Sequence, residues 1–489
     1  MPVTTQDSVS ARVLRDHPVL PVIVLCFGGL TASLTQTLLI PIQSELPQLL
    51  STSGPNAAWV ITITLLAGAV AMPTAGRLAD LFGKQRVIAV SAAILVVSSV
   101  VCALSDSLAP MLVGRAGQGL AMGFIPVGIS LMREITPPHL SGTAIAAMSA
   151  TLGVGGAIGL PLSAWIVDAF DWHTLFWVAT AMAALVLLAV LLLVPHTRDA
   201  DASGRFDAVG AVGLAIGLVS FLVGVSKATT WGWGDPRTLG AIALGIVVLV
   251  GWAAFEIRQD QPLVDLRTTA QLPVLMTNIA AVSIGFGMMA QAIVVPQLLQ
   301  LPEATGYGLG QSVLAAGLWM APGGLMMLVF APVSSTLIRR VGAKVTLMIG
   351  AGVLGLGYLF ALFLMDAPWK LLIASCIASA GVGIGYAAMP TLILDSVPPR
   401  EAGSAVGVNA LMRSVGTTVA AAIMATVLTS VTVEMGGFAL PSENAFKWCF
   451  ALGALAAFVG VAIAGLVPRR GATSDDAGLS VAAAGPVRR

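Results

Sequence analysis

The stretch Gly76–Arg86, which reads GRLADLFGKQR, lies between two apolar segments that are each long enough to cross a bilayer. It has the pattern G-x-L-x-D-x-x-G-x-x-R, and we expect it to form a charged loop. Two glycines allow a tight turn, and Asp80 can accept hydrogen bonds from an arginine or from the N-terminus of a helix. The residues that define the pattern are Gly76, Arg77, Asp80, Gly83, Lys84 and Arg86.

The composition places the whole chain in a membrane. Of the 489 residues, 57% are hydrophobic and only 10% are charged, and the mean hydropathy is +0.94. A soluble domain carries about a quarter charged residues. The chain has no phosphate-binding loop, nucleophile elbow, dinucleotide loop or cluster of metal ligands, and its 4 cysteines occur singly. We therefore predict that it is not an enzyme and has no cofactor or metal.

The apolar segments predict an all-α polytopic membrane protein with fourteen spans, each of about 20 residues. Putting both termini in the cytoplasm leaves only Lys227, Arg237, Lys370 and Lys447 outside, whereas the other basic residues between spans fall inside, as the positive-inside rule requires. The predicted spans are 19–42, 56–75, 87–104, 109–131, 142–167, 174–195, 208–226, 238–255, 272–298, 311–337, 344–365, 369–394, 403–431 and 446–467.

The first six and last six spans read as copies of one another. LPV opens both 20–22 and 272–274, and PPHLSG at 137–142 corresponds to PPREAG at 398–403. Repeated halves are typical of carriers whose site lies between the halves. We predict a cytoplasmic N-terminal segment (1–17), a six-helix bundle (18–195), a linker with two inserted helices (196–271), a second six-helix bundle (272–467) and a disordered cytoplasmic tail (468–489). The charged stretches 196–207 and 256–271 are predicted to be cytoplasmic connectors.

Two further motifs accompany the stretch at 76–86. Arg115, Gln118 and Gly119 form an R-x-x-Q-G sequence within the fourth span, and the fifth span carries a run of glycines followed by a proline. With these motifs the chain resembles the major facilitator superfamily of transporters. The layout of six, two and six spans is similar to that of the fourteen-span drug:proton antiporters, which include multidrug efflux pumps. The resemblance implies the major facilitator fold and a gating role for 76–86.

The resemblance implies a role in proton coupling for Arg115, Gln118 and Gly119. An arginine inside a span is costly and should face a polar interior. The alternative for Arg115 is a structural one, in which it ties the fourth span to neighbouring carbonyls. The run in the fifth span resembles the antiporter motif of exporters, although small residues that let helices pack closely explain most of it. Its residues are Gly153, Gly155, Gly156, Gly159 and Pro161.

The first span departs from the antiporter pattern. Antiporters of this family carry an aspartate near its middle, and the corresponding position here is Ala32. No acidic residue lies well inside a predicted span, and all four histidines lie at membrane edges. The residue that would carry the proton is therefore not identified by sequence.

Uncharged polar residues and one arginine remain as candidates for a substrate cavity. Gln36 and Gln291 occupy equivalent positions in the first and ninth spans. For the asparagines an interhelical hydrogen bond is an equally good interpretation. The candidates are Gln36, Gln291, Asn278, Asn409 and Arg413.

From the resemblance and these residues we expect a secondary active exporter of small lipophilic, drug-like compounds that works by proton antiport and alternating access. It would lie in the cell membrane as a monomer, with lipid, protons and substrate as partners and no nucleic acid. A proton-independent facilitator, symporter or lipid carrier of the same fold stays an alternative, as does a non-transporting scaffold or sensor.

Overall fold

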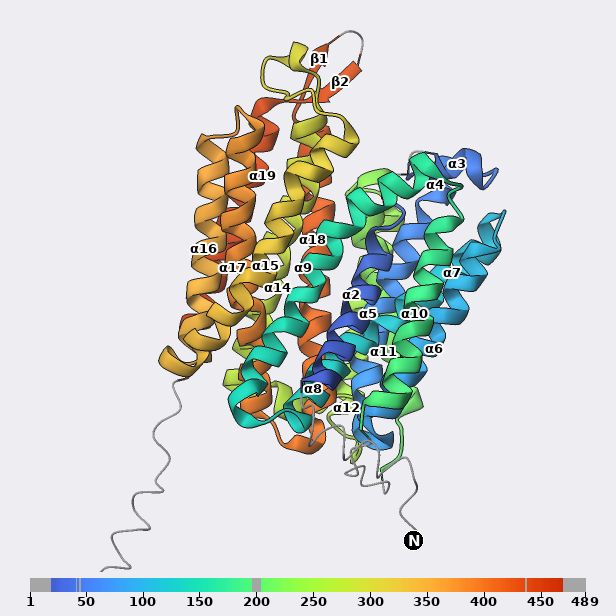
Figure 1. Ribbon diagram of the computed structural model, residues 1–489, viewed down its shortest axis with the longest axis vertical. Helices are drawn as coiled ribbons and strands as arrows, with labels where there is room; N and C mark the ends of the chain where they lie inside the picture. Colours follow the sequence, from blue (N-terminus) through green and yellow to red (C-terminus); the bar gives the residue numbers. More distant parts are fainter. Residues whose placement is uncertain (1–18, 41, 44, 196–203, 436–437, 469–489) are drawn as a thin grey trace, which may run out of the picture.

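The computed structural model describes residues 19–40, 42–43, 45–195, 204–435 and 438–468. The predicted segment 1–17, part of the connector 196–207 and the tail from 469 lie outside the described residues. Nearly all described residues are helical (Figure 1). Up to the end of the first half, the elements are α2 (Leu20–Thr37), α3 (Leu46–Leu49), α4 (Gly54–Ala57), α5 (Trp59–Phe82), α6 (Lys84–Ala103), α7 (Leu108–Leu120), η1 (Ala121–Gly123), α8 (Phe124–Ile135), α9 (Pro138–Ala169) and α10 (Thr174–Leu193).

Two inserted helices and a second set of long helices follow. The remaining elements are α11 (Ala208–Trp231), α12 (Pro236–Glu256), α13 (Leu266–Thr269), α14 (Leu272–Gln300), η2 (Glu303–Thr305), α15 (Val313–Val341), α16 (Ala343–Phe363), α17 (Pro368–Ser396), η3 (Pro399–Glu401), α18 (Ala402–Ser430), β1 (Thr432–Met435), β2 (Phe438–Pro441) and α19 (Glu443–Gly465).

Among the described residues, 13 helical segments are long and apolar enough to span a membrane. A fourteenth is α9, whose parts Pro138–Gly156 and Pro161–Ala169 are bent by 41° and pass the same test together. A helix satisfies every backbone polar group internally, which the bilayer interior demands because it offers no water. The prediction of an all-α polytopic membrane protein is confirmed, and the count is compatible with fourteen spans.

The long helices form two groups that meet along two helix pairs. α5 of the first group packs along α18 of the second, and α9 packs along α15. At one end of the bundle, which we call the gate end, the last turn of α5 and the start of α18 lie together. The groups diverge toward the opposite, far end, where α3 and the β1–β2 strands lie at the top of Figure 1. The exact boundaries of the two bundles and the linker stay predictions.

Local geometry follows the repeat seen in the sequence. α2 and α14 both begin with the LPV sequence, and each has its proline in the first turn, where the missing N–H is not needed. The turn between α5 and α6 is Gly83 with φ +97°, and the turn between α15 and α16 is Gly342 with φ +86°. Only glycine adopts this left-handed region without cost. The two halves therefore use the same one-residue turn at corresponding places.

The inserted helices α11 and α12 pack on each other, and α11 also contacts α5 and α18. The Trp233 indole N–H donates to Thr426 Oγ1 of α18 over 2.8 Å. Lys227 was expected outside the spans, but α11 continues to Trp231 and buries it. Its ammonium lies over the ring of Trp59 at 4.6 Å, so a cation–π contact holds the charge against α5.

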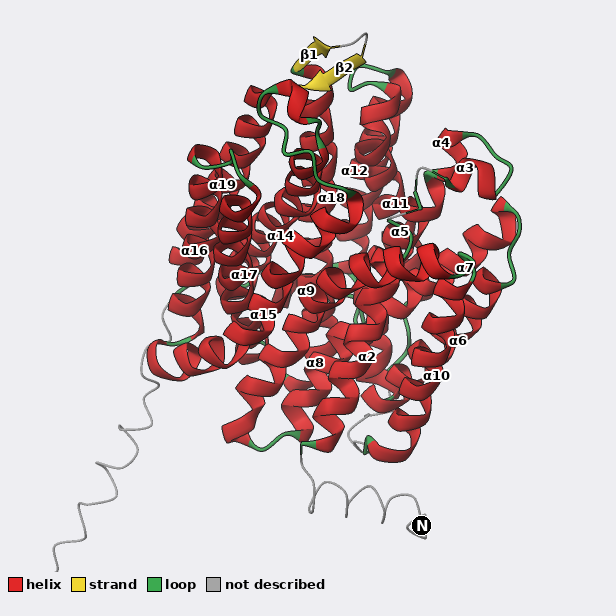
Figure 2. Cartoon of the chain, turned by 45° about the horizontal axis from the view of Figure 1, so that its top comes forward, coloured by secondary structure: helices red, strands yellow, loops and turns green. Residues whose placement is uncertain are grey.

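A two-stranded antiparallel hairpin, which the sequence did not predict, caps the far end (Figure 2). β1 and β2 pair from Thr432 opposite Pro441 to Met435 opposite Phe438. The Tyr307 hydroxyl donates to the Pro441 carbonyl over 2.6 Å and so ties the hairpin to the segment after α14.

We expect Gly416→Ala to destabilise the protein. A methyl group at Gly416 of α18 would run into the backbone of Val282 on α14, whereas at Gly352 its nearest neighbour would be Val461 at 3.9 Å. Overpacking of this kind costs about 1–3 kcal/mol, while Gly352→Ala gains helix propensity. Thermal unfolding of both variants in detergent should show a lower melting temperature for Gly416→Ala alone, and equal values would contradict the close approach.

Candidate functional site

The pattern at 76–86 was predicted to be a loop, but it forms the last turns of α5, a turn at Gly83 and the first turn of α6. Gly76 therefore does not make a turn. It allows α5 to touch α18, because a side chain there would run into the Gly403 backbone. Helical backbone hydrogen bonds continue through α5 up to Phe82, and the helix ends at Gly83.

Asp80 connects the two halves. One carboxylate oxygen accepts the Gly403 N–H at 2.9 Å and the other accepts the Ser404 N–H at 2.8 Å. Both donors belong to the first turn of α18, whose N–H groups have no partner within the helix and carry the positive end of the helix dipole. The Asp80 side chain thus caps the N-terminus of a helix in the opposite half.

Further contacts close the same end. Arg133 of α8 forms an ion pair with Asp395 of α17 at 2.6 Å, and the Thr143 hydroxyl on α9 donates to Ser335 Oγ on α15 at 3.2 Å. Like Asp80, each contact joins the first half to the second. The gate end is therefore closed by polar contacts that water can replace.

The basic residues of the pattern have different surroundings. Lys84 is buried and forms an ion pair with Glu134 of α8, so it braces the first half. Arg86 is exposed. Arg77 has a buried Nε with no hydrogen-bond partner, and it lines a cavity of about 120 Å³ together with Asp260, Asp265 and Glu401.

Arg115 is 1% exposed and lies where four helices of the first half meet. Its Nη1 donates to the Thr35 carbonyl of α2 at 3.0 Å and to Gln118 Oε1 at 2.7 Å, and its Nε donates to the Val60 carbonyl of α5 at 3.2 Å. Gln118 in turn donates to Ser99 of α6 at 3.0 Å. This arrangement fits the structural interpretation, in which the guanidinium ties α7 to neighbouring carbonyls.

Gly119 and three of the predicted glycines of α9 are packing positions. A side chain at Gly119 would meet Thr64 and Ala67 of α5. Side chains at Gly155 and Gly159 would meet α2, at Ser33 and Thr37, and one at Gly153 would meet Met327 of α15.

Gly156 has no neighbour within 4 Å, and Pro161 begins the second part of the bent helix. α9 is thus wedged between α2 of its own half and α15 of the other.

The predicted cavity residues do not form one cluster. Asn409 donates to Asn278 Oδ1 at 3.0 Å, and both are buried between α18 and α14, which matches the interhelical interpretation. Gln291 donates to Ser379 Oγ at 3.3 Å. Gln36 has a buried Nε2 without a hydrogen-bond partner.

Arg413 lies one turn after Asn409 on the same face of α18. Its guanidinium lies over the Tyr386 ring at 4.6 Å, and the Tyr386 hydroxyl contacts Met288 Sδ at 3.0 Å. Arg413 is thus placed by an aromatic ring of α17 within the second half.

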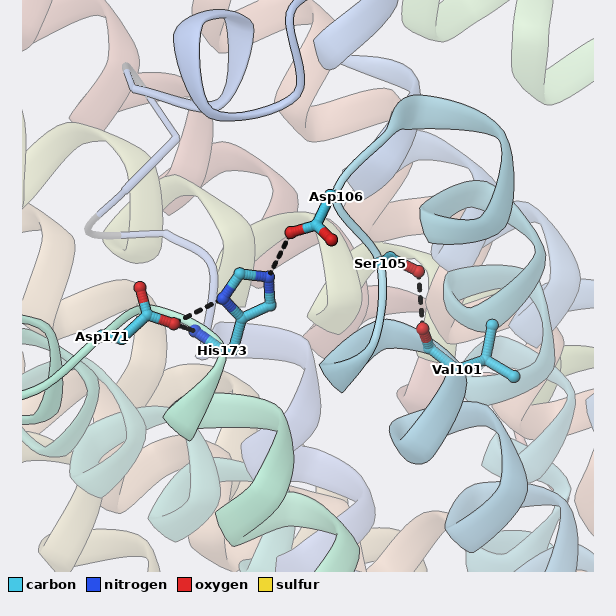
Figure 3. Close-up of polar contacts among 5 residues, drawn as sticks. All are labelled: Val101, Ser105, Asp106, Asp171 and His173. Carbon is cyan, nitrogen blue, oxygen red and sulfur yellow. Dashed lines mark hydrogen bonds and ion pairs between the residues drawn. The ribbon is translucent and has the colours of Figure 1, made fainter.

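A histidine bridges two loops at the far end (Figure 3). His173 Nε2 lies 3.3 Å from Asp106 Oδ1, and its Nδ1 contacts Asp171. Desolvation acts to raise the pKa of Asp171, but the hydrogen bonds and charge of His173 outweigh it and hold that pKa below its ordinary value. These loops join α6 to α7 and α9 to α10, so the contact stays within the first half.

Some residues at the gate end were missed by sequence reasoning. Glu256 was assigned to a connector, but it is the last residue of α12 and is 1% exposed. The sequence signal for this burial was the position of Glu256 directly after an unbroken apolar run, because the helix continues one residue past that run. The Arg133–Asp395 pair had no signal, because the two residues are far apart in sequence.

Comparisons with known proteins agree with this architecture. The family model described as Major Facilitator Superfamily matches residues 25–421 and 279–483. The chain is 28% identical over 424 residues to the tetracenomycin C resistance and export protein of Streptomyces glaucescens, covering 86% of this chain and 78% of the relative. It is 26% identical to the multidrug resistance protein B homolog of Mycobacterium tuberculosis, covering 76% and 69%.

Solved structures show the same fold. The human organic anion transporter MFSD10 superposes with a TM-score of 0.64 at 17% identity, covering 91% of this chain and 99% of that one. The proton:xylose symporter XylE superposes with a TM-score of 0.64 at 13% identity, covering 94% and 97%.

We expect Asp80→Asn to loosen the gate end. The amide loses the charge that the α18 N-terminus stabilises, and hydrogen bonds to a charged group contribute about 1.5–3 kcal/mol. Ala331→Cys in a cysteine-free chain reports opening, because this position on α15 is 2% exposed and lies one turn before Ser335, in one cluster with Ala146 of α9. Its labelling by an impermeant maleimide should accelerate about tenfold in Asp80→Asn. Asp366→Asn at the far end is the control, and an unchanged rate in Asp80→Asn would contradict the role of Asp80.

We expect Arg115→Lys to lower thermal stability. An ammonium on a flexible stem cannot reach Thr35, Val60 and Gln118 with the fixed fork that a guanidinium offers. The loss is about 2 kcal/mol, since charged donors are left unpaired in a buried site. In thermal unfolding, Arg115→Lys should have a lower melting temperature than Arg86→Lys, which changes an exposed arginine of the same half. Equal melting temperatures would show that the Arg115 network is not structural.

Proposed function

Because the chain belongs to the major facilitator superfamily, we propose that it is a secondary active exporter of small lipophilic, drug-like compounds that is driven by proton antiport and works by alternating access. Members of this family are membrane-spanning transporters and not enzymes. One relative is named a resistance and export protein, and another is named a multidrug resistance protein homolog. These names support export and the substrate class.

One observation carries alternating access: the two halves are joined at the gate end by contacts that can be exchanged for water. Asp80 binds the first turn of α18, and Arg133 pairs with Asp395. The contacts at this end would break and reform during the cycle, while the halves diverge at the far end. The distribution of basic residues supports a cytoplasmic gate end, and under this proposal the closed gate end belongs to a state that is closed toward the cytoplasm.

The first span supports the second candidate, a carrier of the same fold without proton coupling. Ala32 is 2% exposed in α2, at the position where antiporters of this family carry an aspartate. Arg115 is nearby in the fold through its bond to the Thr35 carbonyl. Coupling by antiport therefore needs a proton site elsewhere.

A proteoliposome assay separates the two candidates. Purified protein is reconstituted with a pH-sensitive dye inside, a pH gradient is imposed, and tetracenomycin-like aromatics and cationic dyes are added. Antiport predicts that a transported compound dissipates the gradient in liposomes that contain the wild-type protein. Protein-free liposomes control for passive permeation.

Transport of a compound without proton movement would overturn antiport and favour the uncoupled carrier. No transport of any compound by a protein of wild-type stability would favour the scaffold or sensor.

A further inference from the structure

The inserted helices bring two carboxylates together at the gate end. Asp207 caps α11, since its Oδ1 accepts the Gly210 N–H at 2.7 Å. Glu256 ends α12 and is 1% exposed, and its Oε2 accepts the Leu263 N–H at 3.1 Å. One oxygen of each carboxylate is therefore used by the backbone.

The two remaining oxygens lie near the same point. Among the described residues, Asp207 Oδ2 and Glu256 Oε1 are both buried, and no group makes a full hydrogen bond to either of them. A methyl group placed on Gly210 would lie 2.5 Å from the first and 2.6 Å from the second, so both point at the same place. The two groups also interact electrostatically.

Two carboxylates at such a site cannot both be charged without strong repulsion, whereas one shared proton supplies the missing donor. Among the described residues, no lysine or arginine forms an ion pair with either carboxylate. The indole N–H of Trp252, one turn before Glu256, is a neutral donor that interacts with the Glu256 carboxylate, although the two groups do not reach full hydrogen-bond geometry.

Other charged groups around the pair are engaged elsewhere or exposed. Arg205 and Arg258 are exposed, the Arg267 guanidinium donates to the Ile257 carbonyl, and Asp265 caps α13. Within the described residues, the charged groups on the surrounding elements are Arg205 beside α11, Arg258, Asp260, Asp265 and Arg267 in the connector, Arg77 and Asp80 on α5, and Arg400 and Glu401 before α18.

A single buried residue links the pair to the gate. Leu263 is held by Glu256 through its N–H, and its carbonyl accepts the Ser404 hydroxyl at 3.2 Å. The Ser404 N–H is bound by Asp80. Moving Glu256 would therefore free the segment that rests on the start of α18.

We propose that Asp207 and Glu256 form a proton-binding site that holds one shared proton while the gate end is closed and releases it when this end opens. The proposal rests on the proposed alternating-access function and makes the pair a proton-controlled element of the gate. The proton leaves an O–H bond of the pair and passes to water on the gate side. The two charges then repel, Glu256 gives up Leu263, and the contact with Ser404 weakens.

The test measures gate opening directly. In a cysteine-free full-length chain in nanodiscs, nitroxides are attached at His139→Cys and Arg340→Cys, two exposed positions at the gate ends of α9 and α15. Pulsed electron paramagnetic resonance gives their distance from about pH 5 to about pH 9, a range that covers coupled carboxylates. We expect the population with the longer distance to rise with pH in the wild type.

The variants assign the change to the pair. Glu256→Gln keeps the acceptor for Leu263 and adds an amide donor toward Asp207, so it should stay in the short-distance state at every pH. Asp207→Asn keeps a cap on α11 and should likewise abolish the pH shift. Asp235→Asn is the matched control, because Asp235 caps the other end of the same hairpin and is bonded to Arg237, and its shift should equal the wild type.

A wild-type distance that does not change with pH overturns the proposal, and so does a pH shift that survives in both Glu256→Gln and Asp207→Asn, since Asp80 would then carry it. If thermal unfolding shows that one variant is not folded, the pH dependence of the other variant tests the proposal. A shift that depends on the pair in a protein that moves no protons with substrate would uphold the proton site and refute antiport.

Discussion

The contact between Asp80 and the first turn of α18 determines how the two halves can move relative to each other. It joins a charge on one half to backbone N–H groups of the other, so it is specific in geometry but can be exchanged for water without unpairing any helix. The apolar interior of the second half, in contrast, is built around buried side chains such as Tyr358, Phe446 and Phe450. Each half can therefore stay intact while the contact between them breaks.

Charged side chains in the interior of the helix bundle have different partners from those at the ends of the helices. Arg115 is satisfied by carbonyls and a glutamine, and Arg413 by an aromatic ring, so neither needs a carboxylate. The half-buried Asp80 and the buried Glu256 lie instead at helix ends of the gate side. A single end of the protein thus holds both the contact that closes it and the groups that can respond to protons.

The fold could be predicted from sequence because apolar length and repeated motifs depend on the bilayer and on local backbone geometry. Such local rules predict the turn at Gly83 and the LPV starts of α2 and α14. They also predict that Asp80 accepts hydrogen bonds from a helix N-terminus. The site could be predicted less well. Nothing local distinguishes Asn278 and Asn409 as partners, and Glu256 reads as part of a polar connector until the packing of 263–264 buries it. Pairings across the halves, such as Arg133 with Asp395, depend on tertiary structure alone.

The position of α12 has a consequence for the surrounding lipid. This helix of 21 residues packs on α11 and leaves most of its side chains on the outside of the protein. At 1.5 Å per residue it is about 31 Å long, close to the hydrocarbon thickness of a bilayer. A thinner or thicker bilayer would tilt α12 and displace its last residue, Glu256, relative to α5 and α18. Hydrophobic mismatch would then act on the closing contact, so the lipid composition itself becomes a variable of the transport cycle.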